Sequence, residues 1–107
     1  MISRLVSCNI QPAKVNEFKT TLNNELLPRI QSQPGFLENI ESLDAATGQF
    51  TCLTLWKTKE DVARYDEGLF REVAEKLGPW MQAAPTVQTL PVENASAQKV
   101  RAGKAAA

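Results

Sequence analysis

The sequence predicts one α+β domain, in which a four-stranded antiparallel sheet carries two helices on one face. Three observations lead to this prediction. At 107 residues, 43% of them apolar, the chain can form one modest core and is too apolar to be disordered over most of its length. Stretches of alternating apolar residues are separated by two stretches in which apolar residues recur every three to four positions. The segment 49–65, QFTCLTLWKTKEDVARY, joins both patterns, because a strand ending in Trp56 leads through a short turn into a helix.

The first half of the chain predicts a strand followed by a helix. Residues 2–10 alternate as a strand, and Pro12 then opens a helix, since proline has no amide hydrogen to lose in a first turn. We expect Pro28 to bend or break the last turn of this helix, because it removes the hydrogen bond to the carbonyl of Asn24. The apolar stripe of the helix consists of Val15, Phe18, Leu22, Leu26 and Ile30.

The middle of the chain predicts a hairpin and a second helix. Gln33-Pro34-Gly35 ends the first helix, and strands 36–43 and 50–56 flank a loop in which Gly48 suits a left-handed conformation. Thr58 caps the next helix, with Asp61 completing a capping box, and Gly68 marks a kink or a junction within it. The apolar side of this helix consists of Val62, Tyr65, Leu69, Phe70, Val73 and Leu77.

The last predicted strand, 86–92, completes the order βαββαβ, which right-handed crossovers fold into the ferredoxin-like arrangement. The domain therefore spans residues 1–92, and 93–107 is expected to be a flexible tail with almost nothing to bury. Helices cover only one face of such a sheet. Strand 50–56 nevertheless carries large apolar groups on both faces, with Leu53 and Leu55 opposite in phase to Trp56. We therefore expect a homodimer formed through the uncovered sheet face.

Composition excludes several classes of function. Twelve basic residues balance twelve acidic ones, so no bulk charge attracts nucleic acid or an anionic membrane. No stretch approaches the roughly 20 apolar residues of a membrane span, and no secretory signal is visible, so a cytoplasmic protein is expected. Histidine is absent, which excludes the usual zinc sites, histidine-held haem and any nucleophile–histidine pair. Cys8 and Cys52 are expected to be small buried apolar groups in a reducing compartment, although a disulfide between them is an alternative.

The chain resembles the antibiotic biosynthesis monooxygenase (ABM)-type domains of the dimeric α/β-barrel superfamily over about residues 1–92. Leu27-Pro28 followed by Gln33-Pro34-Gly35-Phe36 carries the resemblance, together with Trp56 before Lys57-Thr58-Lys59-Glu60. It implies a pocket between sheet and helices that binds a small hydrophobic or aromatic ligand. It also implies oxidation of quinol- or anthrone-like molecules by dioxygen without a cofactor or metal. A deprotonated, electron-rich aromatic can itself give an electron to oxygen, so the protein needs only to bind it, take a proton and shield the intermediate.

The resemblance also implies two alternatives to a monooxygenase. One is a non-catalytic module for ligand binding or assembly, and the other is an isomerase or lyase acting on ring lactones or polyketides. The haem-degrading branch is excluded, because the chain has no histidine ligand.

Trp56 and Tyr65 are the catalytic candidates. Trp56 matches the family's strand-end tryptophan, and Tyr65 stands nine positions later, where many relatives have histidine. Its hydroxyl is suited to orient a substrate or relay a proton. Cys52 and Thr54 occupy the positions where some members place a pocket asparagine. For Trp56 the alternative is plain core, and for Tyr65 it is a packed ring with its tip in water.

Arg4 is the most pointed binding candidate. It shares a strand face with Val6 and Cys8, and a buried arginine requires a carboxylate or an anionic ligand. The alternative is an arginine that reaches water at the rim of the sheet. The predicted substrate-binding residues are Arg4, Cys52, Phe18, Leu22, Leu69 and Phe70, although the apolar ones have the spacing of any core.

Overall fold

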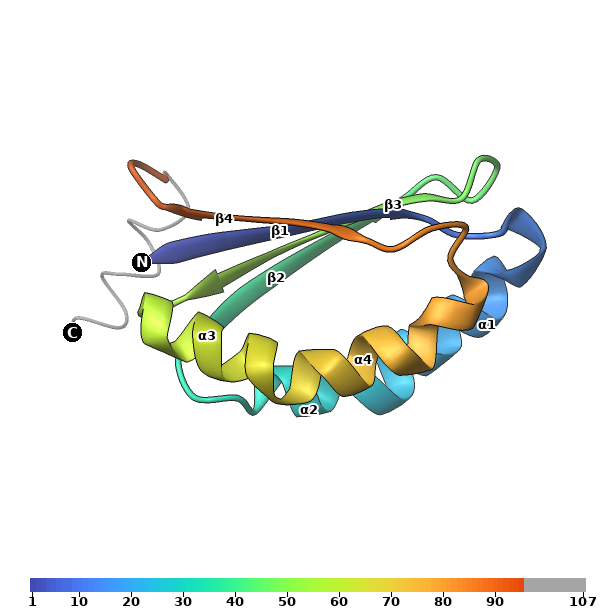
Figure 1. The fold of residues 1–107 in the computed structure, drawn as a ribbon. Coiled ribbons are helices and arrows are strands. Elements are labelled where there is room, and N and C mark those ends of the chain that lie inside the picture. Colours follow the sequence, from blue (N-terminus) through green and yellow to red (C-terminus); the bar gives the residue numbers. More distant parts are fainter. Residues whose placement is uncertain (96–107) are drawn as a thin grey trace.

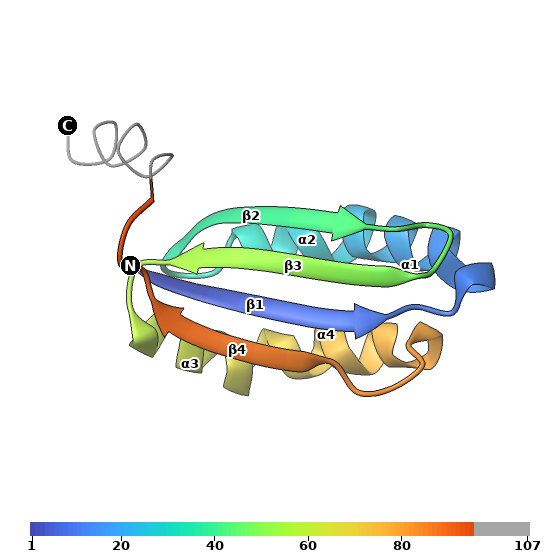
Figure 2. The same cartoon turned by 90° about the horizontal axis from the view of Figure 1, so that it is seen from above.

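A four-stranded antiparallel sheet forms one layer of the molecule, and all helices lie on one of its faces (Figure 1). The computed structural model describes residues 1–95, so most of the expected tail at 93–107 lies outside the described residues. The strands are β1 (Ile2–Asn9), β2 (Phe36–Leu43), β3 (Gln49–Trp56) and β4 (Thr86–Pro91). Their spatial order is β2-β3-β1-β4, as Figure 2 shows from above. The predicted ferredoxin-like βαββαβ order is thereby confirmed.

The first of the two helical runs that cover the sheet is continuous and has a wide turn in its middle. A short 3₁₀ turn, η1 (Pro12–Lys14), leads into α1 (Val15–Thr21), the π-helical segment η2 (Leu22–Leu26) and α2 (Leu27–Gln31). Of the two effects expected of Pro28, a bend or a break in the last turn, the break does not occur. The amide of Leu27 bonds to the carbonyl of Leu22, five residues back, and this wider turn accommodates the proline ring so that the helix continues to Gln31.

The second helical run divides into two helices at Gly68, as predicted. α3 (Lys59–Glu67) and α4 (Leu69–Leu77) meet there, and a 3₁₀ turn, η3 (Gly78–Trp80), follows. The predicted cap of α3 is also confirmed, because the Thr58 hydroxyl accepts a hydrogen bond from the amide of Asp61 at 3.1 Å and donates one to its carboxylate at 2.8 Å.

The strand register sets which side chains face the helices. Trp56, Thr54, Cys52 and Phe50 of β3 point toward the helical layer, and β1 places Arg4 beside Thr54 and Val6 beside Cys52. On the other side of β3, β2 places Glu41 beside Cys52. The core fills the space between this face and the helices, and it includes Ile10, Phe18, Leu26 and Leu77.

The opposite face of the sheet has no helix over it (Figure 1). Leu53 of β3 lies between Leu5 of β1 and Ile40 of β2, with Leu55 and Leu90 in the next row. Ile40 is 57% exposed and Leu90 is 53% exposed. We call these five residues the outer apolar patch. No helix among the described residues is long and apolar enough to cross a membrane.

Candidate ligand cavity between the sheet and the helices

An enclosed cavity of about 50 Å³ lies between the sheet and the helical layer. Both helical runs and three strands contribute to its largely apolar wall, which includes Val6, Phe18, Leu22, Leu27, Ile30, Phe50, Phe70, Val73, Ala74, Leu77 and Met81. The polar or titratable residues in the wall are Arg4, Cys8, Glu41, Cys52, Thr54 and Tyr65. This volume holds a few water molecules, whereas pockets for ring-shaped ligands usually measure roughly 300–1,000 Å³. The cavity is therefore too small, as it stands, for a ring-shaped ligand.

Arg4 lies on β1 and is buried beneath the helical layer, with 2% of its surface exposed. Its Nε donates a hydrogen bond to Oδ1 of Asp66 at 2.9 Å, and its Nη2 lies 2.8 Å from the same oxygen. Nη2 makes this ion pair without an aligned hydrogen bond, so its donor capacity is unused. The guanidinium also stacks over Phe70 at 4.1 Å and Tyr65 at 5.0 Å from the ring centroids. The alternative of a solvated arginine at the sheet rim is wrong.

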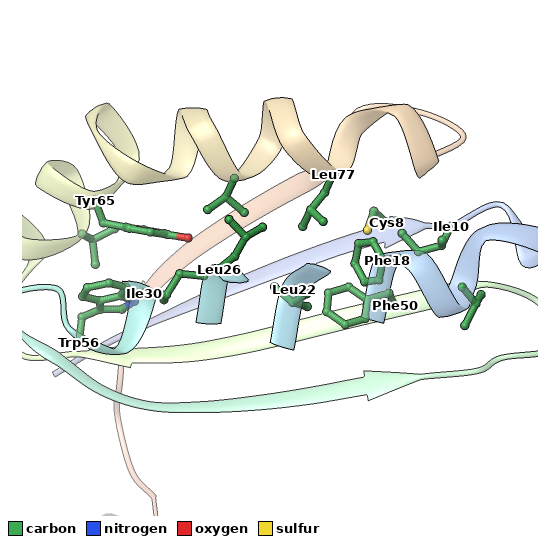
Figure 3. Packing of buried hydrophobic residues seen from close by; sticks show 13 residues of the cluster. Cys8, Ile10, Phe18, Leu22, Leu26, Ile30, Phe50, Trp56, Tyr65 and Leu77 are labelled. Carbon is green, nitrogen blue, oxygen red and sulfur yellow. The ribbon is translucent and has the colours of Figure 1, made fainter. Parts of the chain in front are cut away.

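Trp56 and Tyr65 form one stacked pair, of which only Tyr65 borders the cavity. Their ring centroids lie 5.0 Å apart with an interplanar angle of 28°, and Trp56 is fully buried. The indole Nε1 donates to Oγ1 of Thr54 at 2.8 Å, which fixes the ring. Trp56 does not border the cavity itself, whereas Tyr65 does. In Figure 3 the Tyr65 hydroxyl points from α3 toward the middle of the core, so the alternative of a tip in water is wrong.

Burial makes the hydroxyl of Tyr65 and the two thiols poor acids. It raises the pKa of Tyr65 well above the usual value for a phenol, because the charged form loses its hydration. It also raises the pKa of Cys8, and it raises that of Cys52 to about 12, to which the negative charge of Glu41 contributes. Both cysteines are free thiols, so the alternative of a disulfide is wrong. These three groups keep their protons at neutral pH, so they can donate hydrogen bonds but are not available as bases.

Glu41 is a carboxylate in the cavity wall that the sequence analysis did not select. It lies opposite Cys52, on the face of β2 that points toward the helices. Burial raises the pKa of Glu41. Counting outward from the hairpin would have found it, since the pair Leu43–Phe50 places Glu41 against Cys52. The Asp66 carboxylate that pairs with Arg4 had no such signal.

The structure brings most of the predicted binding residues to one cavity. Arg4, Cys52, Phe18, Leu22 and Phe70 all line it. Leu69 packs against the core from the start of α4 and is not among the residues that line the cavity. Figure 3 shows Phe18 and Phe50 at one end of the core, Trp56 and Tyr65 at the other, and leucine side chains between them. The roles of these residues toward a ligand stay predictions.

Comparison with known proteins identifies the architecture. No family model and no curated protein matches the chain. The crystal structure of an antibiotic biosynthesis monooxygenase matches with a TM-score of 0.73 at 16% identity, over 88% of this chain and 100% of that chain. A monooxygenase from the gene ActVA-Orf6 of Streptomyces coelicolor, solved in complex with nanaomycin D, matches with a TM-score of 0.72 at 16% identity, over 88% of each chain.

The chain has the fold of the antibiotic biosynthesis monooxygenases. A variant of SnoaB, a cofactor-independent oxygenase from Streptomyces nogalater, shares this ABM-type fold at a TM-score of 0.69 and 11% identity, over 89% of this chain and 95% of that chain. The fold that the tryptophan and Pro-Gly motifs imply is thus confirmed. The TM-scores of 0.69 to 0.73 establish the ABM-type architecture, and at identities of 11% to 16% the similarity extends to the fold alone.

Proposed function

We propose that the chain is a cofactor-independent monooxygenase acting on a small aromatic, quinol- or polyketide-like molecule. The observation that carries this proposal is the cavity between sheet and helices, which is apolar over most of its wall and is bordered by Arg4, Glu41 and Tyr65. An apolar wall with a few convergent polar groups is typical of a small-molecule site. The ABM-type fold supports the proposal, since two structures that share it are named as oxygenases.

The proposed chemistry needs three contributions from the protein. An apolar enclosure binds the flat ligand and excludes water from the reactive intermediate. The Tyr65 hydroxyl, which keeps its proton, donates a hydrogen bond to a ligand oxygen. Trp56 positions Tyr65 through the stacked contact, and the bond from its indole to Thr54 holds that stack in place. Arg4 supplies a buried positive charge beside the rings of Tyr65 and Phe70.

A ring-shaped ligand enlarges the cavity on binding. α4 is the element best placed to yield, because it supplies Phe70, Val73, Ala74 and Leu77 to the wall and is flanked by Gly68 and Gly78. Two exposed ion pairs join it to the first helical run, Arg29–Glu72 at 2.8 Å and Lys76–Glu25 at 3.3 Å. Exposed pairs of this kind hold helices only weakly.

Oxygen uptake tests the proposed function. Purified protein is mixed with a panel of hydroquinones and anthrones, and dioxygen consumption is followed with an electrode. We expect turnover of at least one compound and a decrease of about 100-fold in Tyr65→Phe, the lower end of what a positioned proton donor contributes. Trp56→Phe should also slow turnover. The matched control is Trp80→Phe, because Trp80 does not line the cavity.

The small volume of the cavity favours one alternative, a non-catalytic module for ligand binding or assembly. Failure of every panel member to bind or to consume oxygen would support that alternative against the monooxygenase. Conversion of a ring lactone or polyketide without oxygen uptake would instead support an isomerase or lyase.

The proposed protein acts as a homodimer. The outer apolar patch (Leu5, Ile40, Leu53, Leu55 and Leu90) has one row running from Ile40 through Leu53 to Leu5, and in the row beside it Ser3 separates Leu55 from Leu90. The row on the other side, Ser42, Thr51, Ser7 and Thr86, is polar. An apolar centre beside a polar margin is typical of a protein–protein interface. A second copy packed sheet to sheet would remove Ile40 and Leu90 from water.

A further inference from the structure

Glu41 lies among the residues of the cavity in an otherwise apolar row of the sheet. Its partners in that row are Cys52 on β3, Val6 on β1 and Val87 on β4. Cys52 and Val6 both line the cavity, so the register directs the Glu41 side chain to the same side of the sheet. A glutamate is an unusual choice here, because the charged form of a partly buried carboxylate loses hydration.

No cation compensates the charge of Glu41 within the described residues. The one cation in the cavity wall, Arg4, is paired with Asp66, and the other salt bridges also use other carboxylates. The hydrogen bond that Glu41 receives, from Nδ2 of Asn39, is long at 3.4 Å. The charged carboxylate is therefore stabilised only weakly by its neighbours, and desolvation raises its pKa. A structural carboxylate would be expected to have the partner that Asp66 has.

The other titratable groups facing the cavity cannot accept a proton at neutral pH. The guanidinium of Arg4 on β1 has no lone pair to offer. Burial keeps the thiols of Cys8 on β1 and Cys52 on β3 protonated, and it does the same for the phenol of Tyr65 on α3. Glu41 is thus the one base in this wall among the described residues. A carboxylate whose pKa is raised by burial is a stronger base, and it is therefore suited to take a proton from a ligand.

We propose that Glu41 is the proton acceptor of the cavity, a catalytic residue that takes the acidic proton of a bound anthrone or quinol. This inference rests on the proposed function. The C–H or O–H bond of the ligand breaks, its proton moves to the Glu41 carboxylate, and the electron pair stays on the ligand as an enolate or phenolate. That anion lies in the cavity whose wall contains the Arg4 cation. Dioxygen, the oxidant of the proposed reaction, then takes an electron from it.

The test separates proton transfer from oxidation by excluding oxygen. 1,8-Dihydroxyanthrone is added under argon to wild type, Glu41→Gln, Glu41→Asp and Glu75→Gln, the last being an exposed glutamate of α4. Binding is followed by calorimetry, and the anthrone anion is followed by its absorbance. We expect the anion in wild type and in Glu75→Gln. In Glu41→Gln the affinity should stay within about threefold while the anion decreases at least tenfold, with Glu41→Asp intermediate.

Admission of air completes the experiment. Oxygen uptake should fall by about 100-fold in Glu41→Gln, and the wild-type rise of rate with pH through the Glu41 titration should disappear. If Glu41→Gln forms the anion and turns over as wild type does, the inference is wrong while the proposed function stands. If wild type neither binds nor oxidises the anthrone or any other member of the panel, both are wrong.

A measurement on wild type alone covers the case in which Glu41→Gln does not fold. The side-chain carboxyl carbon of Glu41 is labelled with ¹³C and observed by NMR at neutral pH under argon. Saturation with 1,8-dihydroxyanthrone should shift this signal to the position of a protonated carboxyl. An unchanged signal in the saturated complex would overturn the inference.

Discussion

Arg4 is buried because three neighbours replace water around it. Asp66 neutralises its charge, and the rings of Tyr65 and Phe70 cover its planar surfaces. The Asp66 side chain is 38% exposed, so the carboxylate could be solvated without the arginine, whereas the arginine could not be solvated without rearrangement. Loss of the ion pair is therefore more costly for the buried Arg4 than for the partly exposed Asp66.

We predict that Asp66→Asn lowers the free energy of unfolding by about 2 kcal/mol, because it leaves a buried guanidinium without its counter-charge. Arg4→Met combined with Asp66→Asn should be less destabilising than the sum of the two single changes. Urea unfolding measures both effects. Arg29→Gln serves as the control, since its pair with Glu72 is exposed and should matter little. Equal losses in Asp66→Asn and Arg29→Gln would contradict this account.

Cys52 should resist alkylation in the native protein. With a pKa of about 12, its thiolate fraction at pH 8 is about 10⁻⁴, against about 0.1 at the ordinary value of 9.0. We therefore predict iodoacetamide labelling about a thousandfold slower in the folded state than in urea. The measurement uses Cys8→Ser, so that mass spectrometry follows Cys52 alone. Similar rates in the two states would show that this strand opens readily.

Glu41 should make stability depend on pH. Its folded-state pKa is raised above the unfolded value, so the folded state binds its proton more tightly. The resulting stability is present in acid, below the ordinary glutamate pKa of 4.5, and is lost as pH rises through the folded-state pKa. Glu41→Gln lacks this titration, so its free energy of unfolding should rise relative to that of wild type as the pH increases from acid through the folded-state pKa. Parallel pH profiles in urea unfolding would argue against the desolvated carboxylate.

At the scale of elements, the turn before β2 depends on one glycine. Gly35 has φ +81°, and a Cβ there would collide with the Asp61 side chain at the start of α3. We predict that Gly35→Ala lowers the free energy of unfolding by about 1–3 kcal/mol through backbone strain and this collision. Gly35→Ala with Asp61→Ala should recover only part of the steric cost, because the Cβ of residue 61, 2.6 Å from the added Cβ, remains. Thermal unfolding distinguishes the two contributions, and no loss in Gly35→Ala would mean that this turn relaxes.

α4 offers a test of whether the cavity is empty space. Val73→Ile adds one methylene at a buried position of the wall without changing the β-branched character of the residue. If the added group fills the void, stability should rise by up to about 0.8 kcal/mol and anthrone binding should weaken. Val62→Ile is the control, because Val62 is buried in α3 but does not line the cavity. A loss of stability in Val73→Ile would show that the wall is already tightly packed.

The wide turn Leu22–Leu26 was not predicted, although the spacing of the apolar residues contains a signal for it. The buried positions Phe18, Leu22, Leu26 and Ile30 follow one another at steps of four. A regular α-helix would overshoot three turns by about 120° over those 12 residues. Burial of all four therefore required a wider turn, yet each step separately is compatible with an ordinary helix. The caps and hairpin were predictable because each depends on adjacent residues.

The cavity was predictable only in part. Alternation along the strands placed Arg4 and Cys52 on the helix face correctly. Spacing could not show that Trp56 lies behind Tyr65, or that the cavity beside them is small, because both depend on side-chain packing across elements. Glu41 needed the register of two strands, which the hairpin supplies once its loop length is counted.

At the scale of the whole molecule, the outer apolar patch should control assembly. Leu53 is at the patch centre, where β3 meets β1 and β2. We predict that wild type is a dimer at micromolar concentration and that Leu53→Glu is a folded monomer, because a buried unpaired carboxylate opposes association. Light scattering measures both, and circular dichroism checks the fold. Thr51→Glu, in the polar row of the same face, should perturb the dimer less. A monomeric wild type would contradict the dimer.

The stack of Trp56 on Tyr65 gives this protein an internal optical reporter. The chain has two tryptophans, and Trp56 is sealed from solvent one ring away from the cavity, while Trp80 stands at the far end of α4. A guest that displaces the Tyr65 ring alters the surroundings of one indole and leaves the other as an internal reference. Emission of the unlabelled protein, compared between Trp80→Phe and Trp56→Phe, will therefore register occupancy before any substrate is known.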